Sequence, residues 1–114
     1  MSGILATALY CNQPKNRKDF DGKFDCSGFV AFCYRENGIK NVPHSSSEIW
    51  EKGLIGNGAA GDIACWNGHV GICDGQGNVI HSYHKGKLIV AHTIQQVSQP
   101  NWSGEFKGFR RFSN

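Results

Sequence analysis

A cysteine and a histidine stand where they could act together as a nucleophile and its base. Cys26 directly follows Asp25 at the start of an apolar segment, and His69 opens a later β-like run. A thiol needs a nearby base to attack a carbonyl at neutral pH, and cysteine hydrolases use a histidine for this. Asp25 can cap a helix that begins at Cys26, where unpaired amides and the helix dipole favour a thiolate. The pair predicts a cysteine hydrolase in which His69 accepts the thiol proton or forms an ion pair with Cys26.

A third member of this site follows from counting along a hairpin. Residues 69–83 predict two antiparallel strands joined by a loop over 74–78. Pairing the residues that flank the loop places His69 and His81 on one face as diagonal neighbours, with Cβ atoms about 7 Å apart or less. We therefore expect His81 to fix the tautomer and orientation of His69.

The remaining residues around the hairpin receive smaller roles. Gly71 leaves room for the two imidazoles, and the backbone amide of Cys26 is expected to hold the oxyanion. His84 falls on the opposite face of its strand in this register. Replacing His84 or His92 by alanine should therefore change activity little.

Four short sequence segments resemble those of a known family. They are Phe24–Val30, Gly61–Ile63, His69–Ile72 and Gly77–His81. In these segments, the chain resembles the NlpC/P60 family of papain-like cell-wall peptidases from about residue 10 to residue 111. The order of the candidate catalytic residues, a cysteine, then a histidine, then a third polar residue, is also similar to that of the family.

The resemblance implies an activity and a set of catalytic residues. The family cleaves amide bonds in peptidoglycan stem peptides, typically next to D-glutamate, through an acyl-enzyme on the cysteine. The catalytic roles carry over to Cys26, His69 and His81, and no cofactor or metal is expected.

The resemblance also suggests substrate-binding residues. Tyr10 is similar to a family tyrosine that lines the substrate cleft. Asp25 and Ser27 match positions that can contact a substrate amino group, although Asp25 is equally explained as a helix cap.

Other functions were weighed against this interpretation. The nearest alternative is a CHAP-type N-acetylmuramoyl-L-alanine amidase or a phage lysin domain. A metal site could draw on sulfur and nitrogen ligands from Cys26, Cys65, Cys73, His69 and His81. The chain lacks the Cys-x-x-Cys and His-x-x-x-His spacings typical of zinc sites. A non-enzymatic metal- or wall-binding module is the remote alternative, and binding alone would not require the catalytic residues.

The order of the structural signals, helices first and strands afterwards, predicts an α+β domain. The resemblance implies that this domain has the papain-like NlpC/P60 fold, with N-terminal helices packed on a C-terminal antiparallel sheet. Helices are expected over residues 1–9, 26–37 and 46–52, the last capped by Ser45, and residues 56–61 are expected to form a loop. Strands are expected at Ile63–Trp66, His69–Cys73, Val79–Tyr83, Leu88–Ala91 and Phe106–Arg111.

Length and composition indicate one folded domain. The 114 residues are 39% hydrophobic and 18% charged, so we expect a single catalytic domain over residues 1–114 rather than disorder. No apolar run approaches the length of a membrane span, and the net charge of +3 is interpreted as a solvated face. We expect a monomer without a nucleic-acid partner. Five cysteines leave the disulfide state open.

The expected place of action is the periplasm or cell wall, because peptidoglycan is there. Residues 1–9 are interpreted as a first helix and not as a signal peptide. Delivery as an injected antibacterial effector is favoured over a phage lysis protein or a domain of a longer exported parent. An immunity protein is an optional partner of such an effector.

Overall fold

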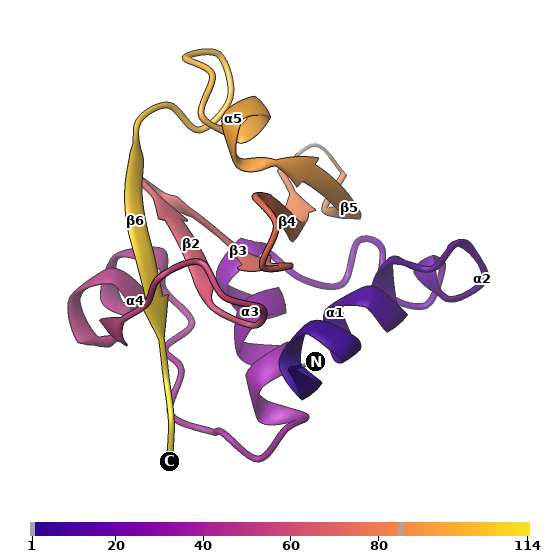
Figure 1. The fold of residues 1–114 in the computed structure, drawn as a ribbon. Helices are drawn as coiled ribbons and strands as arrows, with labels where there is room; N and C mark the ends of the chain where they lie inside the picture. The colour runs from indigo at the N-terminus through magenta and orange to yellow at the C-terminus, as the bar shows by residue number, and fades with distance from the viewer. Residues whose placement is uncertain (1, 85) are drawn as a thin grey trace.

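The computed structural model describes residues 2–84 and 86–114, which form helices packed around a curled antiparallel sheet (Figure 1). The helices are α1 Gly3–Asn12, α2 Pro14–Arg17, α3 Cys26–Arg35, α4 Ser46–Lys52 and α5 Ile94–Val97. The strands are β1 Leu54–Ile55, β2 Ile63–Trp66, β3 His69–Cys73, β4 Asn78–Tyr83, β5 Leu88–Thr93 and β6 Phe106–Arg111. Their order across the sheet is β1-β6-β2-β3-β4-β5. The predicted α+β organisation is confirmed.

Side-chain caps explain where the two central helices begin. The carboxylate of Asp25 accepts a hydrogen bond from the amide of Gly28 at 2.7 Å and starts α3. The hydroxyl of Ser45 accepts from the amide of Glu48 at 3.3 Å and starts α4. Helix α3 ends two residues earlier than predicted, because the chain after Arg35 already forms a turn that leads to a positive φ of 84° at Gly38.

The register of the β3–β4 hairpin is the one predicted from the sequence. Cys73 lies opposite Val79, and Ile72 lies opposite Ile80. The loop between the strands is held by the carboxylate of Asp74, which accepts hydrogen bonds from two backbone amides of the same loop. This register decides which face of the sheet each histidine occupies.

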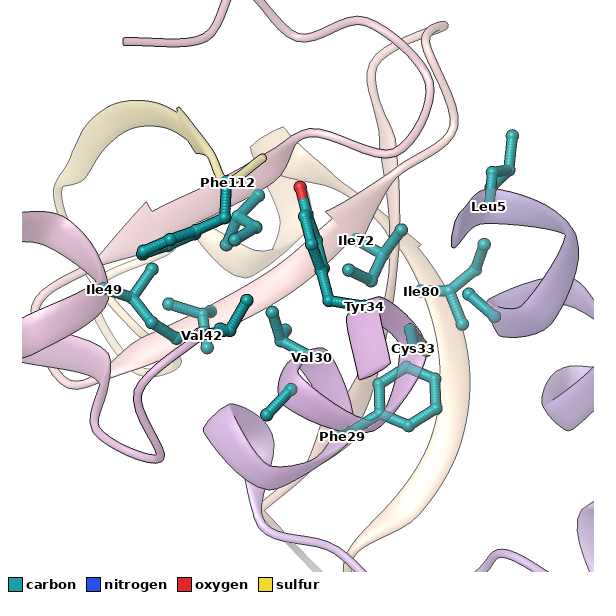
Figure 2. Packing of buried hydrophobic residues seen from close by; sticks show 14 of the residues in the cluster. Leu5, Phe29, Val30, Cys33, Tyr34, Val42, Ile49, Ile72, Ile80 and Phe112 are labelled. Atoms are coloured by element: carbon teal, nitrogen blue, oxygen red, sulfur yellow. The ribbon is translucent and has the colours of Figure 1, made fainter. Parts of the chain in front are cut away.

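The main core lies between α3 and the sheet. Phe29, Val30, Cys33 and Tyr34 project from α3 toward strands β3 and β4, and Ile72 is among the strand residues that meet them (Figure 2). Burying this face holds α3 rigidly against the sheet, and its first residue, Cys26, is held with it. Within residues 2–84 and 86–114, no helix has both the length and the hydrophobicity needed to cross a bilayer.

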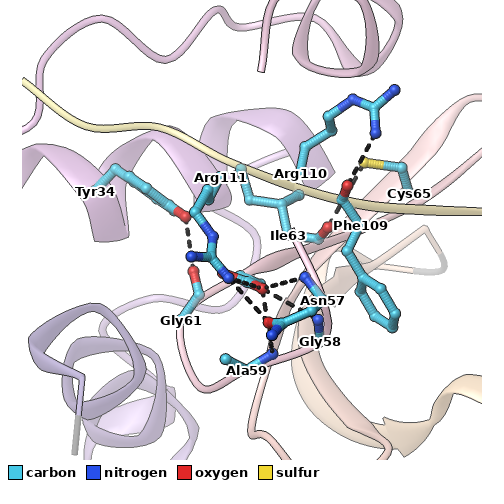
Figure 3. A network of polar contacts seen from close by, with 11 residues as sticks. Tyr34, Asn57, Gly58, Ala59, Gly61, Ile63, Cys65, Phe109, Arg110 and Arg111 are labelled. Atoms are coloured by element: carbon cyan, nitrogen blue, oxygen red, sulfur yellow. Dashed lines mark hydrogen bonds and ion pairs between the residues drawn. The ribbon is translucent and has the colours of Figure 1, made fainter. Parts of the chain in front are cut away.

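The loop over 56–61, predicted as a loop, is organised by a buried carboxylate that sequence analysis did not single out. Asp62 is 4% exposed. One of its oxygens accepts hydrogen bonds from the amides of Asn57, Gly58 and Ala59 at 3.0–3.2 Å and from the guanidinium of Arg111 at 2.9 Å (Figure 3). The short elements β1, α2 and α5 were also not predicted.

Candidate active site

Cys26 is the first residue of α3 and lies in a pocket of about 220 Å³. The pocket is lined by Asp25, Cys26, Gly68, His69, Ser82, Tyr83, His84 and Lys87. The sulfur of Cys26 lies 3.9 Å from the carbonyl oxygen of Gly68. All five cysteines are free thiols, and Cys26 is half-buried whereas the other four are buried.

Two long-range hydrogen bonds hold the segment before Cys26 against the sheet. The hydroxyl of Ser82, on β4, donates to the carbonyl oxygen of Phe24. The amide of Ile89, on β5, donates to the carboxylate of Asp21 at 2.8 Å. These bonds tie the start of α3 to the strands that carry the histidines, so the nucleophile does not depend on core packing alone. They join segments far apart in the sequence, and no local pattern signalled them.

His69 and His81 meet as the hairpin count predicted. Nε2 of His69 lies 2.7 Å from Nδ1 of His81, and the two rings are nearly perpendicular at 80°. Both side chains are buried, at 7% and 1% exposure. Nδ1 of His69 is therefore the ring nitrogen left for the pocket that it shares with Cys26. Gly71 allows this arrangement, because a Cβ atom at that position would lie only 3.0 Å from Cβ of His81.

His92 joins the same chain of imidazoles, which the sequence analysis did not foresee. Nε2 of His81 lies 2.9 Å from Nδ1 of His92. In the β4–β5 pairing, His92 lies opposite Val79, so it is a diagonal neighbour of His81 on the same face. Extending the register count by one strand would have found it. The expectation that replacing His92 by alanine changes activity little did not take this contact with His81 into account.

Two other expectations about the pocket need correction. His84 is exposed as expected, but it follows the end of β4 in a turn and lines the pocket with Cys26, whereas we expected it on the opposite face. Strand alternation does not extend into that turn. Tyr10 is 55% exposed and packs edge-on against Phe20, and it lines a different pocket. The structure therefore does not bring Tyr10 to the Cys26 pocket.

The other two predicted substrate-binding residues lie on either side of Cys26. Asp25 lines the pocket, and one of its oxygens caps α3. Ser27 is 5% exposed. A substrate amino group could therefore reach the carboxylate of Asp25 more readily than the side chain of Ser27.

Burial keeps both the thiol and the imidazole neutral. Burial raises the pKa of the Cys26 thiol, and the charge of Asp25 raises it further, while the backbone amide of Val70 opposes them. Burial, together with His84, lowers the pKa of His69 to about 4. Burial therefore opposes the predicted stabilisation of a thiolate by the helix terminus. Of the two roles predicted for His69, accepting a proton fits these pKa values better than a resting ion pair.

Metal-ligating side chains do not gather elsewhere in the described part of the chain. Across residues 2–84 and 86–114 there is no group of three or more His, Cys, Asp or Glu side chains placed to hold a metal ion. The five residues weighed as ligands are thus not assembled as one site. Instead, one ring nitrogen of His69 is within hydrogen-bond distance of one ring nitrogen of His81.

Comparisons with known proteins agree with this geometry. The model of the NlpC/P60 family matches residues 10–111. The chain is 30% identical over 101 residues to a γ-DL-glutamyl hydrolase of Bacillus subtilis, covering 80% of this chain and 24% of that protein. It is 35% identical over 80 residues to a protein of Corynebacterium glutamicum named a probable endopeptidase, covering 65% of this chain and 38% of that protein. The chain thus spans well under half the length of both relatives.

Solved structures show the same fold. An NlpC/P60 family protein of Bacillus cereus aligns with a TM-score of 0.63 at 28% identity, over 78% of this chain and 32% of that one. The NlpC/P60 domain of the peptidoglycan hydrolase SagA aligns with a TM-score of 0.66 at 22% identity, over 96% of this chain and 97% of that one, which is evidence of fold alone. The predicted fold is confirmed, and the chain belongs to the NlpC/P60 family.

Proposed function

We propose that this chain is a cysteine peptidase that cleaves amide bonds in peptidoglycan stem peptides. The observation that carries the proposal is the shared pocket, which is lined both by Cys26 at a helix start and by His69. The Nε2 of His69 lies 2.7 Å from Nδ1 of His81. A nucleophile, a base and a group that orients the base form the pattern of covalent acyl transfer.

The proposed reaction uses these residues in two half-reactions. The sulfur of Cys26 attacks the scissile carbonyl while Nδ1 of His69 takes the thiol proton, and the oxyanion lies at the amide of Cys26. His69 then gives the proton to the leaving amine as the C–N bond breaks, which leaves a thioester. Water, deprotonated by His69, attacks the thioester, and the carboxylic acid departs as the thiol is restored. His81 orients His69 throughout.

A basic pocket beside the nucleophile supports cleavage next to D-glutamate. This second pocket, of about 330 Å³, shares Asp25 and Lys87 with the first and is also lined by Lys23, Arg35 and His44. D-glutamate linked through its γ-carboxyl keeps a free α-carboxylate a few bonds from the scissile carbonyl, and the cations suit that group. The amide between the lactyl group of muramic acid and L-alanine has no such carboxylate. The basic pocket therefore favours an endopeptidase over the alternative amidase.

Mass spectrometry of muropeptides digested by the purified protein tests the proposal. We expect peptide fragments that end in D-glutamate and no free sugar chains, whereas release of intact stem peptides would indicate an amidase. Cys26→Ala should retain its fold and lose activity, and His69→Ala should be nearly as damaging. His81→Ala should cost about tenfold to a thousandfold, the range of acid–base positioning. A substrate whose D-glutamate α-carboxyl is amidated should react more slowly.

The substrate also suggests where the protein acts. We propose that it works as a monomer in the periplasm or wall, delivered as an injected antibacterial effector that a producing cell would counter with an immunity protein. The support is the location of peptidoglycan outside the cytoplasmic membrane. The wild type and Cys26→Ala also test this location. Export of the wild type to the periplasm should cause lysis, and Cys26→Ala should abolish it. Harmless export of a folded, secreted wild-type protein would contradict a wall target.

A further inference from the structure

His92 completes a continuous chain of three imidazoles that starts at the nucleophile's pocket. The chain runs from Nε2 of His69 to Nδ1 of His81 at 2.7 Å, and from Nε2 of His81 to Nδ1 of His92 at 2.9 Å. We propose that His92 is a positioning residue that permits, through His81, the tautomer of His69 that can act as the base. The inference rests on the proposed role of His69 as the base for Cys26.

The geometry permits only two proton arrangements along the three neutral imidazoles. A neutral imidazole carries one N–H, and each contact needs one donor and one acceptor. In the first arrangement all three rings are protonated at Nε2, so Nδ1 of His69 is bare and can take the thiol proton. In the second, His92 donates from Nδ1 to His81, and His81 carries its proton on Nδ1 and donates back to His69, so both contacts are again satisfied. His69 is then protonated on Nδ1 and cannot act as the base.

Nδ1 of His92 can favour the productive arrangement because it can accept a hydrogen bond from His81. His81 is 1% exposed, so an Nε2–H without an acceptor would carry the cost of a buried unpaired donor, about 1–3 kcal/mol. Nδ1 of His92 removes that cost. Without this acceptor, the first arrangement would leave a buried N–H of His81 unpaired, whereas the second would leave only an acceptor nitrogen unpaired. Burial lowers the pKa of all three imidazoles, so the rings are neutral near pH 7 and the tautomer argument applies.

Aromatic neighbours hold His92 in the accepting orientation. Its ring lies 4.8 Å from that of Trp102 and 5.6 Å from that of Tyr83, centroid to centroid, in edge-on contacts. A ring that merely filled this space would satisfy the packing equally well. Replacing His92 by phenylalanine therefore separates the two roles, because phenylalanine keeps an aromatic ring and removes the acceptor.

The experiment measures tautomers and turnover in a matched set of variants. Long-range ¹H–¹⁵N NMR of the ligand-free protein should show Nε2–H on His69 and His81 in the wild type and in His92→Asn, whose amide oxygen can accept. His92→Phe should show Nδ1–H populations on both rings. With muropeptides, His92→Phe should lower kcat by about tenfold to a hundredfold with little change in KM. His92→Asn, which keeps an acceptor at this place, should restore most of the kcat that His92→Phe loses.

Two results would overturn the proposal. One is a wild-type His81 protonated on Nδ1. The other is a folded His92→Phe protein with wild-type ¹⁵N shifts for His69 and His81. Because the NMR measurement needs no substrate, it decides the role of His92 even if muropeptides are not cleaved, which would count against the proposed function instead.

Discussion

The pH dependence of Cys26 alkylation distinguishes a neutral resting site from an ion pair. Burial raises the pKa of the thiol above its ordinary value of 9.0 and lowers that of His69 to about 4. A group below its pKa loses a factor of ten in its deprotonated form per pH unit, so at pH 7 at most about 1% of Cys26 is thiolate. The ion pair requires the thiol proton to move to an imidazole whose own pKa is lowered, so burial disfavours it. Free thiolate therefore dominates the reaction with an alkylating agent.

Iodoacetamide is the appropriate probe because the thiolate is the reacting form. The second-order rate constant for Cys26 should rise about tenfold per pH unit between pH 5 and pH 8. The other four cysteines are buried, and burial raises the pKa of Cys11 to about 11 and that of Cys65 to about 12, so labelling should be confined to Cys26. Cys26→Ser, which should not be labelled, is the control. A rate that stays flat from pH 5 to pH 8 would refute the reasoning and establish a resting ion pair.

Two further predictions concern residues that shape the site and the fold. Gly71→Ala would place a Cβ 3.0 Å from that of His81 and should displace this ring by a few tenths of an ångström. Misplacement by 1 Å can cost about a hundredfold, so we expect turnover of muropeptides to fall several-fold to about tenfold; unchanged turnover would mean that the strand adapts without moving His81. Asp62→Ala should lower the free energy of unfolding in urea by about 2–4 kcal/mol, because it leaves three backbone amides without their acceptor. Asp62→Asn, which keeps an oxygen acceptor, should cost less, and equal costs would show that the charge matters more than the amide bonds.

The predictable part of this site follows from regular secondary structure. Asp25 before an apolar segment predicts a helix start, and the cap is present. The hairpin count works because side chains alternate strictly along β3 and β4, so one correct pairing places His69 and His81 on the same face. The same rule applied to β5 would have reached His92. The predicted strand ended at Ala91, whereas β5 continues to Thr93, so the count stopped one residue before His92.

The parts that were not predicted depend on long-range contacts or on irregular backbone. His84 lies in a turn after β4, where side chains no longer alternate between the two faces of the sheet. It therefore lines the pocket, although continued strand alternation would place it on the opposite face. Asp62 gathers the amides of a loop that has no regular structure of its own. The expected thiolate at Cys26 is opposed on energetic grounds: a helix terminus contributes at most about 2 kcal/mol, and burial together with the charge of Asp25 raises the pKa of the thiol.

The neutral resting pair and the chain of imidazoles have a common physical cause. His81 meets an imidazole at each ring nitrogen, so no carboxylate occupies the third position to stabilise a charged His69. Without that negative charge, burial makes an imidazolium costly, and the thiol keeps its proton until a substrate carbonyl can receive the sulfur. Orientation is then the main contribution left to His81 and His92, and orientation requires a defined tautomer more than it requires charge. A thiol that remains protonated is also a poor target for oxidants, because oxidation follows thiolate character. In the proposed mechanism, the same burial that slows deprotonation of Cys26 therefore also protects the thiol from oxidation between turnovers.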